Sequence, residues 1–255
     1  LVVGKELFLK GKELYFSRYR NGNANSDQFF ACFEEVSGRS LALFKQTWLH
    51  TIGYPAVSAR TEYNAGAKRF TVHFRQHPQG DSVFHLPISL ALVDSQGIVI
   101  PGTEKMFELA ESSDKLSFEN IEEPPAFVSL NRDYSFYGTM KQEDVTVDAL
   151  AMQARKDGNA FNRVEAMRQL TDRVRIGLLR DPAQAIDSDW LKLYGELLSD
   201  RTLPSGLKAY LIRIEEQPLD RQYIAWYREQ VVAREKMMRA VNEAYRPLLK
   251  ELFLG

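Results

Sequence analysis

His73 and His77 lie four residues apart and are the first candidates for metal chemistry in this sequence. On a helix, this spacing brings both rings to one face, where they can chelate zinc together. The residues around them alternate between apolar and polar, which indicates a strand, and on a strand the same spacing separates the side chains by about 13 Å. Because zinc–nitrogen bonds are only about 2 Å long, two rings so far apart cannot share a metal. Phe74 also occupies the position at which a helical zinc motif needs glutamate.

The other candidates for chemistry have structural interpretations. Cys32 lies between Phe30 and Phe33 in a helical pattern, where a small buried thiol is expected because no histidine is near in sequence to activate it. Adjacent carboxylates point in different directions and so form no acid–base dyad. We therefore predict no catalytic, cofactor-binding or metal-binding residue. The carboxylate pairs considered are Glu34–Glu35, Glu122–Glu123 and Glu215–Glu216.

A basic stripe between positions 163 and 180 is the remaining charged pattern. Glu165, Asp172 and Asp181 are interleaved with its arginines, so we predict a solvated helix face and not a binding surface. The arginines are Arg163, Arg168, Arg173, Arg175 and Arg180.

The composition is that of an ordinary globular protein. Of 255 residues, 44% are hydrophobic and 26% are charged, with a formal net charge of −1. Positive and negative residues nearly balance in both halves of the chain, which argues against affinity for nucleic acid or anionic lipid. No apolar run approaches the roughly 18 residues that a membrane span needs. We expect neither nucleic acid nor a membrane as a partner.

The single cysteine, Cys32, cannot form an internal disulfide, which favours a reducing compartment and predicts a cytoplasmic protein. Lys5 and Glu6 interrupt the apolar start of the chain, so no signal peptide is predicted. The first residue is Leu1 and not methionine, and we expect the chain to begin inside a longer reading frame.

Residues 1–53 have the apolar spacing of helices. The sequence Asn21-Gly22-Asn23 is expected to end the first helix, and Ser26 or Asp27 to cap the second. A third helix is predicted to begin near Ser40, whose hydroxyl can accept a free amide, and to run on to Ile52.

Trp48 is expected to anchor this third helix. Gly53 is predicted to end this helix in a left-handed conformation. Pro55 follows two residues later and also indicates that the helix does not continue.

Residues 54–137 change to a period of two, which indicates strands. Residues 57–63 and 70–74 alternate on either side of the turn at 64–67, and we predict a hairpin. The short strands and their regular turns are typical of a small β-sandwich. Further strands are expected at residues 85–93, 98–101, 106–109, 115–121 and 126–130.

From position 138 to the end, the helical period returns. Short polar loops join the predicted helices, which favours antiparallel packing in a stacked α-solenoid. The predicted fold class is therefore multidomain α+β: a short helical segment, a small β-sandwich and an all-α helical domain. Helices are expected at residues 147–154, 164–178, 190–197 and 207–214, followed by one long helix or a broken pair at 224–248.

The run LALFKQTWLHTIGYP, at positions 41–55, resembles a DLxxFxxWYxQAGTP helix of the bacterial aminopeptidase N family. Leu49 and Tyr54 replace the tyrosine and the threonine that the family carries. The matching residues are Leu41, Phe44, Trp48, Gly53 and Pro55.

Other stretches extend the resemblance, in order, along nearly the whole chain. GKELYFSRY at 11–19 and FFACFEEVSG at 29–38 are similar to the closing helices of the family's catalytic domain. DGNAFNRVEA at 157–166 resembles a DxxPFNRxEA motif that opens the helical domain, with Ala160 in place of the proline. Its matching residues are Asp157, Phe161, Asn162, Arg163 and Glu165.

The resemblance implies a parent enzyme of the gluzincin class, a zinc metallo-aminopeptidase that removes N-terminal residues from peptides. The family's GxMEN loop, its HExxH zinc helix, its distant glutamate ligand and its catalytic tyrosine all correspond to sequence upstream of position 1. In these terms, residues 1–53 are the C-terminal helices of the catalytic domain and residues 54–137 are the β-sandwich connector. Residues 138–255 are the first part of the C-terminal helical domain, which encloses the peptide chamber.

Two functions from different classes follow. The first is a non-catalytic fragment of a zinc aminopeptidase, inactive by itself, which binds no zinc, is monomeric and contributes to the chamber. The alternative is a free-standing interaction module, in which sandwich and solenoid bind a protein partner through a concave helical face. An exposed apolar patch on residues 1–53 would favour the first function, since helices cut from a larger domain expose their former contacts.

Overall fold

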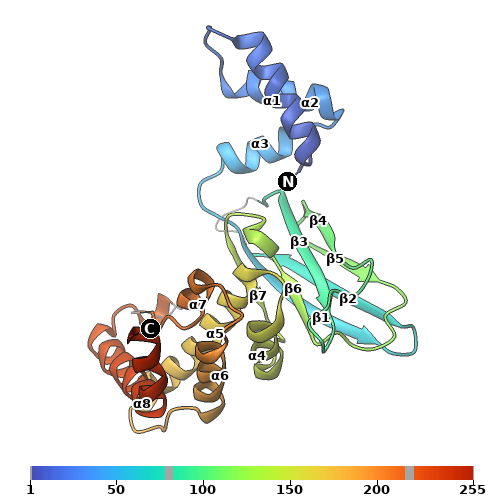
Figure 1. Cartoon of the computed structure of the whole chain (residues 1–255). Helices are drawn as coiled ribbons and strands as arrows, with labels where there is room; N and C mark the ends of the chain where they lie inside the picture. The colour runs from blue at the N-terminus through green and yellow to red at the C-terminus, as the bar shows by residue number, and fades with distance from the viewer. Residues whose placement is uncertain (1, 78–82, 216–220, 255) are drawn as a thin grey trace. The chain divides into compact units, whose positions relative to one another are not determined.

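The computed structural model describes residues 2–77, 83–215 and 221–254 (Figure 1). The chain folds into two compact units. The first comprises Leu1–Ala91, Ile100–Pro124 and Leu130–Asp144, and the second comprises Leu92–Val99, Pro125–Ser129 and Val145–Gly255. Among the described residues, no helix is both long enough and apolar enough to span a membrane.

The first unit begins with three helices, as the apolar spacing predicted. They are α1 (Lys5–Tyr19), α2 (Ser26–Ser37) and α3 (Ala42–Leu49). Helices α1 and α2 approach closely at Gly11, where an added Cβ would lie 2.5 Å from the ring of Phe33. A side chain at position 11 would therefore separate the two helices.

The caps of these helices differ in part from the prediction. Asn25 caps α2 in a reciprocal pair with Gln28, whose backbone N–H donates to the Asn25 side chain over 2.9 Å. The prediction of Ser26 or Asp27 was therefore wrong by one or two residues. At the start of α3, the hydroxyl of Ser40 accepts a backbone N–H over 3.3 Å, as predicted.

Helix α3 ends at Leu49, earlier than the apolar pattern indicated. Ile52 was expected to continue the helix but is 95% exposed in the loop that follows. Gly53 has a φ of 108°, so the prediction of a positive φ is confirmed, although the residue lies in this loop and not at the helix end.

Within the described residues, seven strands form two sheets, and the predicted sandwich is confirmed. The larger sheet has the order β5-β2-β1-β7 and the smaller has the order β4-β3-β6. The strands are β1 (Ala56–Asn64), β2 (Arg69–Gln76), β3 (Leu86–Val93), β4 (Lys105–Leu109), β5 (Ser113–Phe118), β6 (Phe127–Leu130) and β7 (Thr139–Gln142).

Strands β1 and β2 form the predicted antiparallel hairpin, in a register that runs from Val57↔Gln76 to Asn64↔Arg69. One face of the hairpin is apolar. On that face Phe74 stacks on Phe107 of β4, with ring centroids 5.1 Å apart, and so joins the two sheets in the core.

Two strand predictions were wrong. Residues 98–101 form no strand, because only an isolated bridge links Val99 to Val93. Strand β7 was not predicted at all, since its short sequence Thr-Met-Lys-Gln contains only one β-branched residue and no aromatic one. It pairs in parallel with β1, in the register Ala56↔Thr139, so the helical part predicted from position 138 begins later, at Val147.

The second unit contains the predicted helices and a core of apolar side chains that includes Leu170, Trp190, Leu193 and Met237. Helix α5 packs against α4, α7 and α8. Together with the sandwich, these helices confirm the multidomain α+β class. The helices are α4 (Val147–Lys156), α5 (Ala160–Arg180), α6 (Ser188–Ser199), α7 (Ser205–Leu211) and α8 (Tyr227–Leu254).

Helix α8 is one long element with a bend near its end. Tyr245 leaves the helical conformation (φ −124°, ψ 19°), and Pro247 follows inside the helix, where its ring cannot donate a backbone hydrogen bond. The Tyr245 hydroxyl donates to the carbonyl of Leu191 on α6 over 2.9 Å. Its ring occupies the space beside Gly195, where a Cβ would lie 2.2 Å from a ring atom.

Gly53→Val should lower the free energy of unfolding by about 1–3 kcal/mol, because a β-branched residue is strained at a positive φ. Urea unfolding followed by circular dichroism measures the change. Gly66→Val is the matched control, since Gly66 lies in a turn of the same unit without a positive φ. Equal effects of the two substitutions would contradict the assignment of strain to position 53.

Candidate functional site

The histidines that opened the sequence analysis lie on and just after β2, so the strand interpretation is confirmed. The His73 Nε2 atom lies 3.4 Å from a carboxylate oxygen of Glu62, and the His77 Nε2 atom lies 2.8 Å from the hydroxyl of Ser58. Each ring therefore has its own partner. Over residues 2–77, 83–215 and 221–254, no three His, Cys, Asp or Glu side chains are grouped so that they could hold a metal ion.

The other candidate side chains also have separate structural contacts. Cys32 is fully buried, and its thiol donates to the carbonyl of Gln28 over 3.3 Å. The neighbouring carboxylates Glu34 and Glu35 diverge, as expected. Glu34 accepts the backbone N–H of Leu41, whereas Glu35 pairs with Arg18.

The prediction of a solvated arginine face on α5 was wrong in part: Arg173 and Arg180 are exposed, but Arg175 is not. Arg175 is 0% exposed and donates to the carbonyl of Glu215, and burial lowers the pKa of its guanidinium. Arg163 is half-buried, and its Nε donates to the carbonyl of Ala154 over 2.9 Å. The guanidinium groups at the ends of these long side chains donate to backbone carbonyls. A charged residue in the sequence therefore did not indicate a position that faces solvent.

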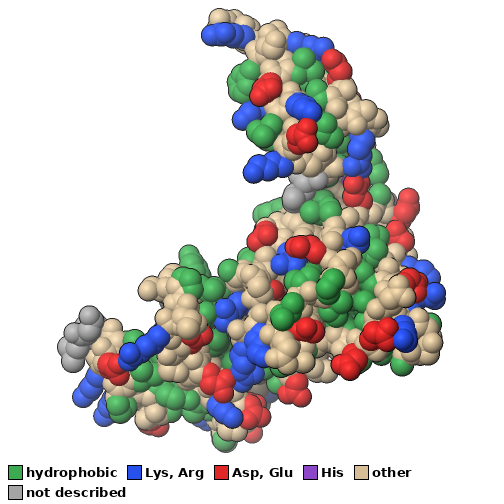
Figure 2. Space-filling view, turned by 45° about the vertical axis from the view of Figure 1, so that its right-hand side comes forward, with side chains coloured by type: hydrophobic (Ala, Val, Ile, Leu, Met, Phe, Trp, Pro, Cys, Tyr) green, Lys and Arg blue, Asp and Glu red, His purple; other side chains and the backbone are tan. Residues whose placement is uncertain are grey.

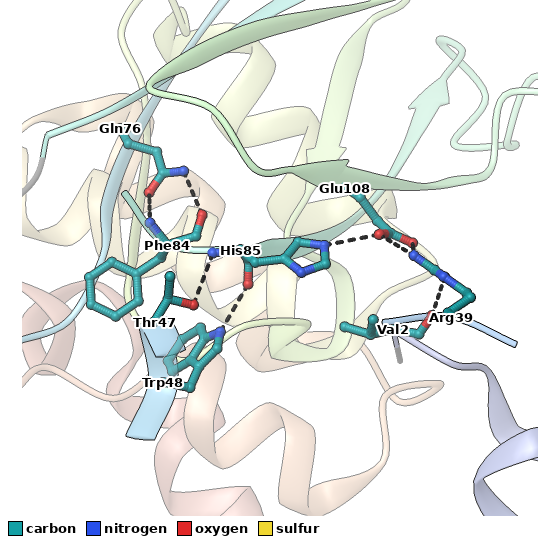
Figure 3. A network of polar contacts seen from close by, with 8 residues as sticks. All are labelled: Val2, Arg39, Thr47, Trp48, Gln76, Phe84, His85 and Glu108. Atoms are coloured by element: carbon teal, nitrogen blue, oxygen red, sulfur yellow. Dashed lines mark hydrogen bonds and ion pairs between the residues drawn. The ribbon is translucent and has the colours of Figure 1, made fainter. Parts of the chain in front are cut away.

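A network of polar contacts in the first unit links α3 to the start of β3 (Figure 3). The Trp48 Nε1 atom donates to the carbonyl of His85 over 2.9 Å, and the His85 backbone N–H donates to the Thr47 hydroxyl over 3.3 Å. Two consecutive residues of the helix thus bind both backbone groups of one residue. We call this network, completed by Arg39 and Glu108, the junction.

The side chain of His85 continues the junction. Its Nε2 atom donates to a carboxylate oxygen of Glu108 on β4 over 2.9 Å. Arg39, between α2 and α3, donates two hydrogen bonds of 2.6 and 2.9 Å to the same carboxylate. Arg39 also donates to the carbonyl of Val2 over 2.7 Å, so the start of the chain is held here as well (Figure 3).

Electrostatics keep the junction in its paired state. The hydrogen bonds from Arg39, and then from His85, hold the pKa of Glu108 below its ordinary value, whereas burial acts in the opposite direction. The same pairing raises the pKa of the Arg39 guanidinium. Glu108 is therefore ionised at neutral pH and accepts all three bonds as a carboxylate.

Aromatic contacts support the polar ones. The Trp48 ring lies 5.3 Å from Phe84 and 6.0 Å from Phe44, measured between centroids. The Gln76 side chain binds both backbone groups of Phe84, over 2.8 and 3.0 Å. Trp48 therefore anchors α3 as predicted, although it is only half-buried. The junction has no activated nucleophile, and its chemistry is that of a positioning contact.

Sequence reasoning missed the junction. Arg39 and Glu108 are separated by 69 residues, and each looks like an ordinary surface charge in its local pattern. His85 was expected only as the first residue of a strand at 85–93. The one local signal was Trp48, whose indole N–H needs an acceptor when it is partly buried.

Comparison with known proteins gives the same division of the chain as the fold. Residues 53–143 match the model of a domain of unknown function, DUF3458, with an Ig-like fold. Residues 147–254 match DUF3458_C, which is described as ARM repeats. Aminopeptidase N of Caulobacter vibrioides is 28% identical over 85% of this chain. Aminopeptidase N of Escherichia coli is 30% identical over 39% of it.

The chain belongs to the aminopeptidase N family. The predicted resemblance is thereby confirmed. This family member spans only 26% of the Caulobacter relative and 12% of the Escherichia relative. The fold agrees with that of Legionella pneumophila aminopeptidase A, solved in complex with aspartic acid, with a TM-score of 0.84 and 23% identity. That comparison covers 99% of this chain and 29% of the Legionella chain.

Trp48→Ala should lower the free energy of unfolding by about 2–3 kcal/mol, less than for a fully buried tryptophan because one part of the ring is solvated. Trp48→Phe keeps most of the ring contacts and loses only the bond to the His85 carbonyl, so a loss of about 1 kcal/mol is expected. Urea unfolding measures both. Equal losses for the two variants would show that the ring itself contributes nothing.

Glu108→Gln should make the stability less dependent on pH. The folded-state pKa of Glu108 is lowered, so its contribution is present above the unfolded-state pKa and is lost as the pH falls through the folded-state pKa. We expect a loss of about 1–2 kcal/mol at pH 7 that becomes smaller as the pH falls through the folded-state pKa, a modest value because a third of the side chain is exposed. Thermal melts across this range test the difference.

Glu119→Gln is the matched control for this experiment. Glu119 pairs with Arg69 in the same unit, but both side chains are more than half exposed. An exposed pair of this kind contributes about 0.5 kcal/mol or less. A pH dependence altered as much by Glu119→Gln as by Glu108→Gln would refute the special role of the junction.

Proposed function

We propose that this chain is a non-catalytic part of a zinc-dependent aminopeptidase that hydrolyses N-terminal residues from peptides. The observation that carries the proposal is the order of its parts: three helices, an Ig-like domain and ARM repeats, matched over 85% of the chain to a protein named aminopeptidase N. Peptides are the substrates of the parent enzyme in this proposal. The parent is a monomer without nucleic-acid or membrane partners, and the single buried thiol of Cys32 suits the cytoplasm.

The donor set of this chain does not fit the zinc ion of the proposed parent enzyme. Its four histidines lie at positions 50, 73, 77 and 85, and those at 73, 77 and 85 have the separate partners described above. Among the described residues, no cluster of ligands could replace them. The zinc ligands and the reacting groups would therefore come from the part of the parent enzyme that lies outside this chain, and the fragment alone is inactive in this proposal.

The three N-terminal helices supply a surface for the missing catalytic part. Phe16 is 61% exposed, Leu49 is 51% exposed, and further apolar side chains are exposed on the same three helices. Figure 2 shows hydrophobic side chains at the surface of this helical segment. Water-exposed apolar groups of this size suit burial against another part of the same protein. The further side chains are Phe8, Leu9 and Leu43.

The hydrogen bonds of the junction attach these helices to the sandwich. In the proposed enzyme, α3 is the last helix of the catalytic domain. Its hydrogen bonds to His85 hold that domain in place against the start of β3. The ARM repeats then form part of the wall that encloses the peptide chamber. The chain therefore contributes to catalysis by positioning, without a residue that touches the reacting atoms.

The alternative function is a free-standing module that binds a protein partner. The helical unit offers one feature in its favour, since the aromatic side chains of Trp226 and Tyr227 are 40% and 61% exposed at the start of α8. Aromatic residues are enriched at protein interfaces. The comparisons with aminopeptidases support the first function more directly.

Zinc content and hydrolysis of an alanine anilide substrate distinguish these functions. Both are to be measured on the 255-residue chain and on the product of its full reading frame. We expect about one zinc ion and turnover in the longer protein, and neither in the shorter chain. Zinc or turnover in the shorter chain would show that it contains a site, and the absence of both from the longer protein would favour the interaction module.

A further inference from the structure

The outer face of the larger sheet carries an array of polar side chains on three adjacent strands. In the antiparallel registers of β1 with β2 and of β2 with β5, alternate residues face away from the core and form two neighbouring rows. All six side chains can donate a hydrogen bond, and none is a carboxylate. The first row is Ser58, Arg75 and Ser113, and the second is Arg60, His73 and Lys115. We call these six residues the donor array.

The donor array borders a hollow of about 490 Å³ that is open to solvent. Ser58 is 7% exposed, so its hydroxyl lies low in this face, and its oxygen lies 2.8 Å from the His77 Nε2 atom. Arg60, Arg75 and Lys115 are exposed around it. A buried hydroxyl with three cations around it is an arrangement that suits an anion.

The three cations have no carboxylate within ion-pair distance in the described part of the chain. Lys68 and Arg69, at the other end of the same hairpin, pair with Glu122 and Glu119, but no such contact involves Arg60, Arg75 or Lys115. The charges of these three side chains are thus available to bind an anionic ligand. A pair within the protein would have reduced the field that an anion experiences.

Carboxylates near the hollow are competitors for the cations of the donor array. Asp114 and Glu143 also line it. Asp114 accepts the backbone N–H of Lys115 over 2.7 Å and is in register with Phe74, on the alternate positions of β5. Glu62 lies 3.4 Å from the His73 ring, in the next row. None of the three lies within the donor array itself.

The dimensions of the array indicate the size of the anion. Neighbouring strands are about 4.8 Å apart, and residues two apart on one strand are about 6.6 Å apart. Two anionic groups separated by a few bonds can therefore contact both rows at once. No aromatic side chain belongs to the array, so a nucleic-acid base would find no stacking partner.

We propose that the donor array binds a small anion that carries two phosphate or carboxylate groups. Arg75 and Ser58 bind one group in the first row, and Arg60 and Lys115 bind the other in the second row. Guanidinium groups suit both chemistries because they can donate two parallel hydrogen bonds to the oxygens of either. The site is separate from the junction and does not depend on the proposed peptidase function.

Calorimetric titration of the 255-residue chain with inorganic pyrophosphate and, in a separate arm, with citrate tests the proposal. We expect saturable binding of at least one probe, and an affinity about tenfold lower in Arg75→Gln, since a charge-assisted hydrogen bond is lost. Binding of pyrophosphate alone identifies a phosphate ligand, and binding of citrate alone identifies a carboxylate ligand. Saturable binding of neither probe at millimolar concentration overturns the proposal.

Arg69→Gln is the matched control. It removes one positive charge from the same strand, about 20 Å from Arg75, at a residue already paired with Glu119. Unchanged affinity in this variant supports the array, whereas an equal loss in both variants would indicate non-specific attraction and overturn it. Lys115→Gln, checked by its melting temperature, provides a second test on β5 if Arg75→Gln does not fold.

Discussion

The carboxylate of Glu108 is the contact on which the arrangement of the first unit depends. It accepts hydrogen bonds from Arg39, which follows α2, and from His85, which precedes β3, while itself belonging to β4. Three segments far apart in sequence are therefore held by one ionised group. A partly buried charge is stable there because both partners supply donors that replace the lost water. Without that carboxylate, the buried ring of His85 would lose its acceptor, and the exposed guanidinium of Arg39 would lose its partner on β4.

Hydrophobic periodicity predicted most of the fold. Strands bury alternate residues and helices bury every third or fourth residue, and both patterns are visible in a short stretch of sequence. The β1–β2 hairpin and the helices from Val147 onward were found in this way. Strand β7 was missed because its pairing with β1, and not its own composition, makes it a strand. Helix α3 was predicted too long because Ile52 continues the apolar spacing although nothing buries it.

The polar sites were beyond sequence reasoning for a related reason. The junction joins residues 69 positions apart, and the donor array appears only when the register of three strands is known. Arg175 shows the opposite error, in which interleaved charges indicated a solvated face and the structure buries the guanidinium completely. Membership of the aminopeptidase N family was visible in the sequence, since motifs such as that at 41–55 keep residue types as well as spacing.

The contact between Gly195 and Tyr245 places a constraint on how this family member can vary. A Cβ at position 195 would overlap the tyrosine ring, and the ring is fixed by its hydroxyl bond to the Leu191 carbonyl. The two positions are therefore coupled: a larger residue on α6 is compatible only with a smaller one at the bend of α8. Sequences of related chains should change at these two positions together. Where the tyrosine is absent, the bend next to Pro247 would no longer bring a ring against α6.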